Sequence, residues 1–320
     1  MISVYTADFG RICFRRYVRH ITEYQEKGSN PMKKVAIATD TNSGMTREKA
    51  QEQGIYLLPM PVIVDEKTYL EGLDITSAQL YQAMHLHQDI SSSQPSPGQL
   101  LEFWDSILRD GYDEIVYIPM SSGLSNSCQN AIQFSLEYEG RVQVVDNHRI
   151  SVTQETSAQS ARKLAQQGLG AREIRDFLEQ RAYDASIYIT VDSMEYLKKG
   201  GRITPAAAAF ATVLNLKPVL TIQGDKLDIF AKVRGMHQAE SKMIEAVRQD
   251  RQTRFGDVPD AQLRVETAGT FENAEQAERW RQLVQAEFPT IPVSYVQLPC
   301  SIACHVGINA AGTGIMKKEA

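Results

Sequence analysis

The chain has 320 residues, of which 42% are hydrophobic and 23% are charged, a balance typical of globular proteins of about two domains. The 39 acidic and 34 basic residues give a formal net charge of −5, which argues against a dedicated nucleic-acid binder. The longest near-apolar run, Ala206–Leu214, is far shorter than the roughly 20 residues of a membrane-spanning helix. With four cysteines and no secretory signal, we expect a cytoplasmic protein with no disulfide framework, metal or cofactor.

The first 31 residues differ in pattern from the rest and end in the breaker cluster Gly28–Pro31. We expect residues 1–31 to be an extension that is disordered or not translated; a targeting or partner-binding arm is the alternative. The remainder is predicted to form an N-terminal α/β domain over residues 32–155 and a C-terminal α/β domain over residues 156–320. The boundary between them falls somewhere within 150–185.

From Val35 onward, predicted strands alternate with predicted helices. Hydrophobic patterning predicts strands over Val35–Thr39, Ile55–Val64, Ile115–Pro119, Val142–Val145, Ile187–Val191, Leu216–Ile222, Leu227–Val233, Leu263–Ala268 and Ile291–Leu298. Start signals and helical spacing predict helices from Thr76 to His87, from Ser96 with Pro97 in the first turn, over Ala131–Tyr138, within Gln154–Arg181, from Pro205, over Met236–Val247 and over Ala274–Glu287. A hairpin turn is expected at Gln223–Lys226. The alternation predicts two α/β domains, each with a mainly parallel sheet flanked by helices.

Polar loops follow several of the predicted strands. They are Asp40–Ser43, Ser91–Ser96, Ser121–Asn126 and Lys198–Arg202, and the polar segment His305–Gly314 follows the last strand. Ligands of open parallel sheets bind beyond the carboxyl ends of the strands. Hydroxyl groups and loop amides donate hydrogen bonds to anions, so these loops predict a site for a small anionic head such as a carboxylate or a phosphate.

Known catalytic motifs are mostly missing from these loops. The chain has no phosphate-binding P-loop and no dinucleotide-binding glycine pattern after its first strand. The segment Gly123–Ser127 lacks the final glycine of a nucleophile elbow. A serine hydrolase triad of Ser122, His305 and Asp146 can still be composed from the sequence, and this enzyme remains an alternative.

Five segments, in this order, resemble the motifs of the DegV family. They are Val35–Asp40, the S-S-Q-P-S run Ser92–Ser96, the P-M-S-S-G-L-S run Pro119–Ser125, the Y-L-K-K-G-G-R-I run Tyr196–Ile203, and His305–Gly312. The resemblance extends from about Lys33 to Met316. The chain departs from the family pattern at three places: Ser92 stands in place of threonine, Asn147 and Ser151–Gln154 stand where the family has serine and a small, glycine-bearing segment, and Ile308–Ala311 differs from the usual run.

The resemblance implies a bacterial fatty acid-binding protein with a long-chain fatty acid buried between two α/β domains. It implies no catalysis by this chain, which is expected to act as the binding subunit for a separate ATP-dependent fatty acid kinase. We expect a monomer, because nothing in the sequence forces a higher oligomeric state. By match of motif, Ser92, Ser122 and His305 are expected to bind the carboxylate. Ser93, Gly123, Leu124, Asp40 and Ser43 are expected in the ligand pocket, and Lys198, Lys199 and Arg202 at the kinase docking surface.

Two other functions stay open at this point. A serine hydrolase requires Ser122 and His305 within hydrogen-bonding distance of each other and an oxyanion hole. A small-carbonyl binder related to dihydroxyacetone kinase subunits would use the same kind of histidine but a pocket too short for a long chain. The depth of the pocket and the partner of His305 therefore discriminate among the three.

Overall fold

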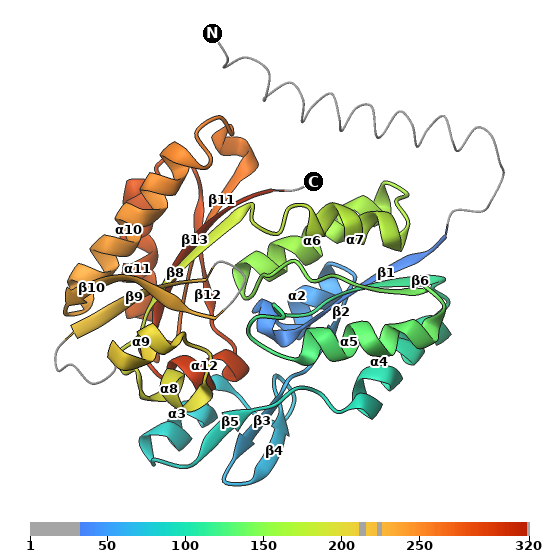
Figure 1. Ribbon diagram of the computed structural model, residues 1–320, viewed down its shortest axis with the longest axis horizontal. Helices are drawn as coiled ribbons and strands as arrows, with labels where there is room; N and C mark the ends of the chain where they lie inside the picture. The colour runs from blue at the N-terminus through green and yellow to red at the C-terminus, as the bar shows by residue number, and fades with distance from the viewer. Residues whose placement is uncertain (1–32, 211–215, 223–225, 319–320) are drawn as a thin grey trace. The chain divides into compact units, whose positions relative to one another are not determined.

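The computed structural model describes residues 33–210, 216–222 and 226–318 (Figure 1). Residues 34–320 group as one compact unit. The expected extension over residues 1–31 lies outside the described residues, as does most of the expected hairpin turn at Gln223–Lys226. The predicted two-domain boundary stays a prediction. No helix in the described ranges is long and apolar enough to cross a membrane.

The N-terminal half contains a four-stranded parallel sheet in the order β2-β1-β6-β7. Its strands are β1 (Val35–Asp40), β2 (Ile55–Leu58), β6 (Glu114–Ile118) and β7 (Val142–Val144). Helices α4 (Pro97–Arg109) and α5 (Ser127–Ser135) cover one face, where Trp104 is fully buried. Helices α6 (Val152–Gln166) and α7 (Ala171–Glu179) pack on the other face. This half therefore matches the predicted parallel α/β architecture.

The C-terminal half contains a six-stranded mixed sheet in the order β10-β9-β8-β13-β11-β12. Its strands are β8 (Ala185–Thr190), β9 (Leu216–Ile222), β10 (Asp228–Arg234), β11 (Leu263–Gly269), β12 (Val293–Gln297) and β13 (Ala311–Lys317). Only β11 and β12 pair in parallel, so the expectation of a mainly parallel sheet in this half is wrong. Strand β13 returns from the end of the chain and inserts antiparallel between β8 and β11, and β9 pairs antiparallel with both β8 and β10.

The two faces of this mixed sheet are covered differently. Helices α10 (Met236–Thr253) and α11 (Ala274–Glu287) cover the outer face, where Trp280 donates a hydrogen bond to the Gly312 carbonyl at 2.9 Å. The inner face contributes Ile189, Leu220 and Ala268 to a second apolar cluster, which also contains Leu124 and residues from α6, α8 (Glu195–Gly200) and α12 (Cys300–Val306). The inner face therefore borders loops of both halves of the chain.

A third, antiparallel sheet in the order β4-β3-β5 completes the fold. Its strands are β3 (Pro61–Val64), β4 (Lys67–Leu70) and β5 (Ile90–Ser92), and α3 (Ser77–His85) and α12 pack against it. The single strand predicted over Ile55–Val64 is thus split between two sheets at Pro59-Met60, where a proline cannot donate to a strand ladder. The remaining short elements are α2 (Arg47–Glu52), α9 (Pro205–Phe210) and the 3-10 turns Thr41–Ser43, Leu136–Tyr138 and Asp260–Gln262.

Local signals placed several helix starts correctly. Thr76 and Gln79 form the predicted capping box of α3, and Ser96 and Gln99 form that of α4 with Pro97 in its first turn. The polar segment His305–Gly314 comprises the end of α12 and the buried start of β13, a further strand that the patterning does not predict. The small residues at the start of β13 allow its backbone to pack closely against neighbouring strands. The polarity of the sequence alone does not indicate such packing.

Candidate functional site

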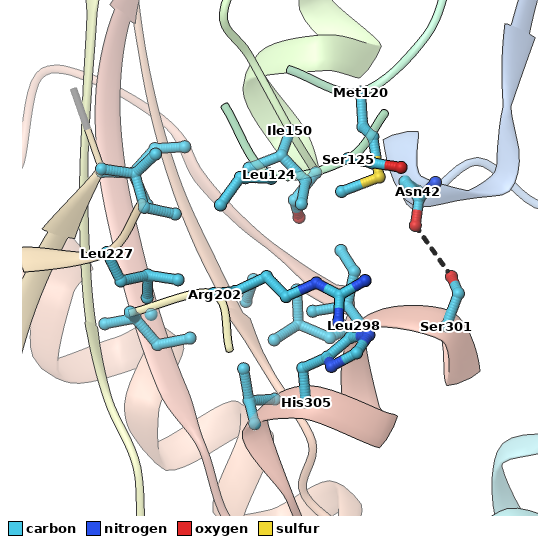
Figure 2. Close-up of a pocket in the computed structure, with 18 of the residues that line it drawn as sticks. Asn42, Met120, Leu124, Ser125, Ile150, Arg202, Leu227, Leu298, Ser301 and His305 are labelled. Atoms are coloured by element: carbon cyan, nitrogen blue, oxygen red, sulfur yellow. Dashed lines mark hydrogen bonds between the residues drawn. The ribbon is translucent and has the colours of Figure 1, made fainter. Parts of the chain in front are cut away.

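A deep pocket lies on the inner face of the mixed sheet. It encloses about 960 Å³ of atom-free space, a volume that includes the solvent at its opening. Its inner wall is largely aliphatic and includes Ile187, Ile189, Ile222, Leu227, Leu298 and Ile302. Polar residues of β5, α12 and the loop after α8 line another part of the pocket, which we call its entrance. Arg202 and His305 lie next to each other there (Figure 2). The pocket therefore has an apolar interior and a polar entrance.

His305 and Ser92 form the central contact of this entrance. The His305 Nε2 atom lies 2.8 Å from the Ser92 Oγ atom, which joins α12 to the end of β5. The imidazole Nδ1 atom is buried and has no hydrogen-bond partner among the described residues. Burial, and next the positive charge of Arg202, lower the pKa of His305 to about 4. The imidazole is therefore neutral at pH 7 and can donate one hydrogen bond and accept another.

Arg202 supplies a positive charge at the same place. Its guanidinium points into the pocket toward His305 (Figure 2) and donates to the Gly200 carbonyl. Burial lowers the pKa of Arg202 from its usual value, and no carboxylate of the described residues lies within ion-pair distance of it. A half-buried cation without a counter-ion is costly, and an anionic ligand would neutralise it. The entrance is thus suited to an anion.

Asn42 is a further pocket residue, which the sequence analysis did not select. It lies in the 3-10 turn after β1 and is 2% exposed. Its Oδ1 atom accepts a hydrogen bond from Ser301 Oγ at 3.0 Å, whereas its Nδ2 atom has no partner among the described residues. The sequence predicts this turn as a ligand loop but points to Asp40 and Ser43 rather than to Asn42. Asn42 offers the pocket a free amide donor.

Asp40 and Ser43 have structural roles instead. The Asp40 carboxylate accepts hydrogen bonds from the Asn42 amide at 3.0 Å, from Gln154 Nε2 at 3.0 Å and from the Met120 amide at 3.1 Å. Burial raises the pKa of Asp40, and these hydrogen bonds oppose the shift. Ser43 Oγ donates to the Asp40 carbonyl at 2.8 Å. Neither residue lines the pocket, so both hold the turn that positions Asn42.

The other predicted site residues separate into two groups. Ser92, Ser93, Leu124, Arg202 and His305 line the pocket together. Ser122 and Gly123 do not, although their neighbours Met120, Leu124 and Ser125 do. Lys198 is exposed, and Lys199 is paired with Asp89 at the surface.

The geometry does not assemble the hydrolase triad. His305 pairs with Ser92 rather than with Ser122, and in the described chain no carboxylate orients its Nδ1 atom. The Ser122 amide donates instead to Asp146, whose carboxylate lies 3.8 Å from His148. A nucleophilic serine needs a base that a third group holds in the correct tautomer. The described residues also contain no cluster of His, Cys, Asp and Glu that could hold a metal ion.

Comparisons with known proteins agree with this architecture. The family model described as "Uncharacterised protein, DegV family" matches residues 34–318. A DegV domain-containing protein of Listeria innocua is 27% identical over 292 residues, which are 87% of this chain and 97% of that protein.

Two solved structures are similar over most of the chain. A fatty acid-binding DegV family protein of Streptococcus agalactiae is 25% identical, with a TM-score of 0.78, over 89% of this chain and 99% of that one. A stearic acid-binding protein of Eubacterium ventriosum shares the fold with a TM-score of 0.80 at 22% identity, over 89% of this chain and 99% of that one.

Proposed function

The chain belongs to the DegV family, and we propose that it binds one long-chain fatty acid in its apolar pocket and presents the carboxylate to a separate ATP-dependent kinase subunit. The chain itself performs no chemical step, since the partner kinase forms the acyl-phosphate. One observation carries the proposal: a deep aliphatic pocket ends at a neutral histidine–serine pair beside an uncompensated arginine.

The aliphatic wall supplies the affinity for the acyl chain. Each buried CH₂ group contributes about 0.8 kcal/mol, so a chain of ~14 carbons offers roughly 10 kcal/mol before ordering costs. A small-carbonyl ligand would use only the entrance and would leave Ile187 and Ile222 without a partner in an empty apolar cavity. The extent of this wall favours a long chain over a small carbonyl compound. The relatives of known structure from Streptococcus agalactiae and Eubacterium ventriosum are described as fatty acid-binding proteins, which supports the same assignment.

The entrance supplies the groups that a carboxylate requires. Ser92 and His305 can each donate a hydrogen bond, Asn42 Nδ2 is a free donor, and Arg202 provides the opposite charge. We therefore assign Arg202 to the head group rather than to kinase docking. Ser122, expected at the carboxylate from its motif, stays a prediction for the ligand-bound form.

Native mass spectrometry of the purified protein, followed by organic extraction, tests the binding function. We expect a retained mass equal to one long-chain fatty acid, which extraction removes and identifies. The control is Lys242→Glu on α10, which packs on the opposite face of the sheet and should retain the ligand equally well. A protein that carries no fatty acid and gains none on addition would overturn the proposal.

The kinase partnership has its own test. Lys198 is exposed and follows the pocket residue Leu197 on α8, so Lys198→Glu should slow ATP-dependent acyl-phosphate formation with a fatty acid kinase subunit while sparing fatty acid binding. Lys242→Glu makes the same charge change away from the entrance and should leave the rate unchanged. Equal rates for both variants would remove Lys198 from the docking surface, and absence of turnover by the wild-type protein would contradict the partnership.

A further inference from the structure

One residue of the pocket wall does not suit a plain hydrocarbon chain. Glu266, on β11, lines the pocket and is 1% exposed. Its Oε1 atom is held by the Arg264 guanidinium and by Ser294 Oγ, the latter at 2.9 Å. Its Oε2 atom is buried and has no hydrogen-bond partner among the described residues. Burying an acceptor without a hydrogen-bond donor costs free energy, so a donor on the ligand would stabilise this oxygen.

The strand register places Glu266 deep in the pocket. Gly269, at the end of β11, accepts a hydrogen bond from the Leu298 amide at 2.8 Å, directly before α12 and its His305. Ala268 therefore lies nearer the entrance, and Glu266 lies two residues, roughly 7 Å, further along the same face. The entrance and this carboxylate are thus at different depths of one pocket.

Neighbouring strands form a row at the level of Glu266. The residue is paired with Gly314 on β13, Gly314 with Ile187 on β8, and Ile187 with Ile222 on β9. Paired residues present their side chains on the same face of a sheet. Ile187 and Ile222 are also pocket residues, so a single carboxylate faces an otherwise apolar row. An acyl chain that reaches this row meets one hydrogen-bond acceptor.

We propose that the pocket selects a fatty acid that carries a hydroxyl group on the distal half of its chain, with Glu266 accepting the hydrogen bond from that hydroxyl. The inference rests on the proposed fatty acid-binding function. A carboxylate can only accept, so the complementary ligand group is a donor, and a hydroxyl adds one without adding charge. A hydrogen bond to a charged group is stronger than one between neutral groups. We therefore expect the hydroxy acid to bind at least about tenfold more tightly than the same acid without the hydroxyl.

Glu155 provides a matched control within the same ionic cluster. It is fully buried, lies 3.4 Å from Arg264 Nη2, and likewise has an Oε2 atom without a partner among the described residues. Unlike Glu266, it does not line the pocket. Lys49 lies closer still to the Glu155 carboxylate, at 2.7 Å. Glu155→Gln and Glu266→Gln each remove one buried negative charge from this ionic cluster, but only the second alters the wall that the ligand touches.

The test is competition for the wild-type protein between stearic acid and 12-hydroxystearic acid at equal concentrations, with the bound masses read by native mass spectrometry. We expect the hydroxy acid to be retained about tenfold over stearic acid, Glu155→Gln to keep that ratio, and Glu266→Gln to lower it. Glu266→Leu should reverse it. The ratio compares two ligands on one folded variant, so a change in stability does not imitate the effect.

Three outcomes are informative. An excess of 12-hydroxystearic acid that disappears only in the Glu266 variants supports the inference. Preference for stearic acid in the wild-type protein, or one ratio in all variants, overturns it while leaving the fatty acid-binding function intact; a water molecule would then satisfy Glu266. Retention of neither acid overturns the fatty acid-binding function and this inference with it. As a positional control, 2-hydroxystearic acid should show no dependence on Glu266.

Discussion

Gly200 lies against His305 so closely that a Cβ atom at position 200 would be 2.5 Å from the imidazole Nδ1 atom. Gly200 is the last residue of α8, and its carbonyl also accepts the hydrogen bond from Arg202. The Gly-Gly pair of the Tyr196–Ile203 motif thus has a packing function at its first glycine. Because Gly200 has no side chain, α8 can approach α12 closely. This close packing keeps the imidazole in contact with Ser92.

Gly200→Ala tests this packing. The added methyl group should displace the imidazole from Ser92 and weaken fatty acid binding about tenfold, the effect of losing one hydrogen bond. Helix stability should not fall, because alanine is favoured over glycine in helices by about 1 kcal/mol. Displacement of a fluorescent fatty acid measures the affinity and urea unfolding the stability. Gly98→Ala, at a position with open space, is the control. Unchanged affinity in Gly200→Ala would show that the contact does not position His305.

Arg202→Met should weaken the binding of a fatty acid by tenfold or more and leave the binding of its methyl ester almost unchanged. The physical reason is that the guanidinium has no carboxylate partner in the described part of the chain and interacts with the charge of the ligand. The acid and its ester share the same tail, so the difference between them isolates the head group. Equal losses for the two ligands would assign Arg202 to packing rather than to charge recognition.

His305 also predicts a pH dependence of stability. Burial lowers its pKa from 6.5 to about 4, so between these values the unfolded chain binds a proton that the folded chain does not. The stability contributed by neutral His305 is complete above pH 6.5 and is lost as the pH falls towards 4. The full shift corresponds to about 3 kcal/mol.

Urea unfolding of the wild-type protein and of His305→Gln at pH 7 and pH 5 measures the pH-dependent stability that His305 contributes. Buried carboxyl groups such as Asp40 and Glu71, whose pKa values are raised by burial, titrate in both proteins and cancel in the comparison. We expect the wild-type protein to lose more stability than His305→Gln between the two pH values. Equal losses would mean that His305 does not resist protonation in the folded state.

Gly312 lies where a larger side chain would limit the length of the bound acyl chain. It lines the pocket between Ala268 and Ile189, its register partners, and a Cβ atom there would meet only ordinary contacts, the nearest at 3.5 Å. Gly312→Ala should be tolerated, whereas Gly312→Val should project into the path of the acyl chain. We expect the valine variant to bind an 18-carbon acid at least tenfold more weakly while losing little affinity for a 6-carbon acid, which is too short to pass this row. An equal loss for both lengths would place the chain elsewhere.

The sequence predicted the local elements well because their signals are local. The capping boxes at Thr76 and Ser96, the apolar run Val35–Thr39 and the loop motifs at Ser92 and His305 all lie in the expected elements or in the pocket. These features depend on residues within a few positions of one another.

Features that depend on distant pairing escaped prediction. Strand β13 owes its place to antiparallel pairing with β8 and β11, which are far away in the sequence. The small residues of β13 give it a composition that is typical of a loop. Asn42 reaches the pocket through the turn that Asp40 and Ser43 hold, and Glu266 reaches it through the register of the surrounding strands. A buried glutamate on a strand cannot be distinguished from an exposed one without that register.

The central claim is that the carboxylate lies at His305 and Arg202 and that the acyl chain runs inward along the mixed sheet. A crystal structure with a fatty acid brominated at its terminal carbon tests this directly, because anomalous scattering locates the bromine. We predict bromine deep in the pocket, near Ile187 and Ile222, with the carboxylate within hydrogen-bonding distance of His305 or Ser92. Bromine at the entrance, or outside the pocket, would contradict the account.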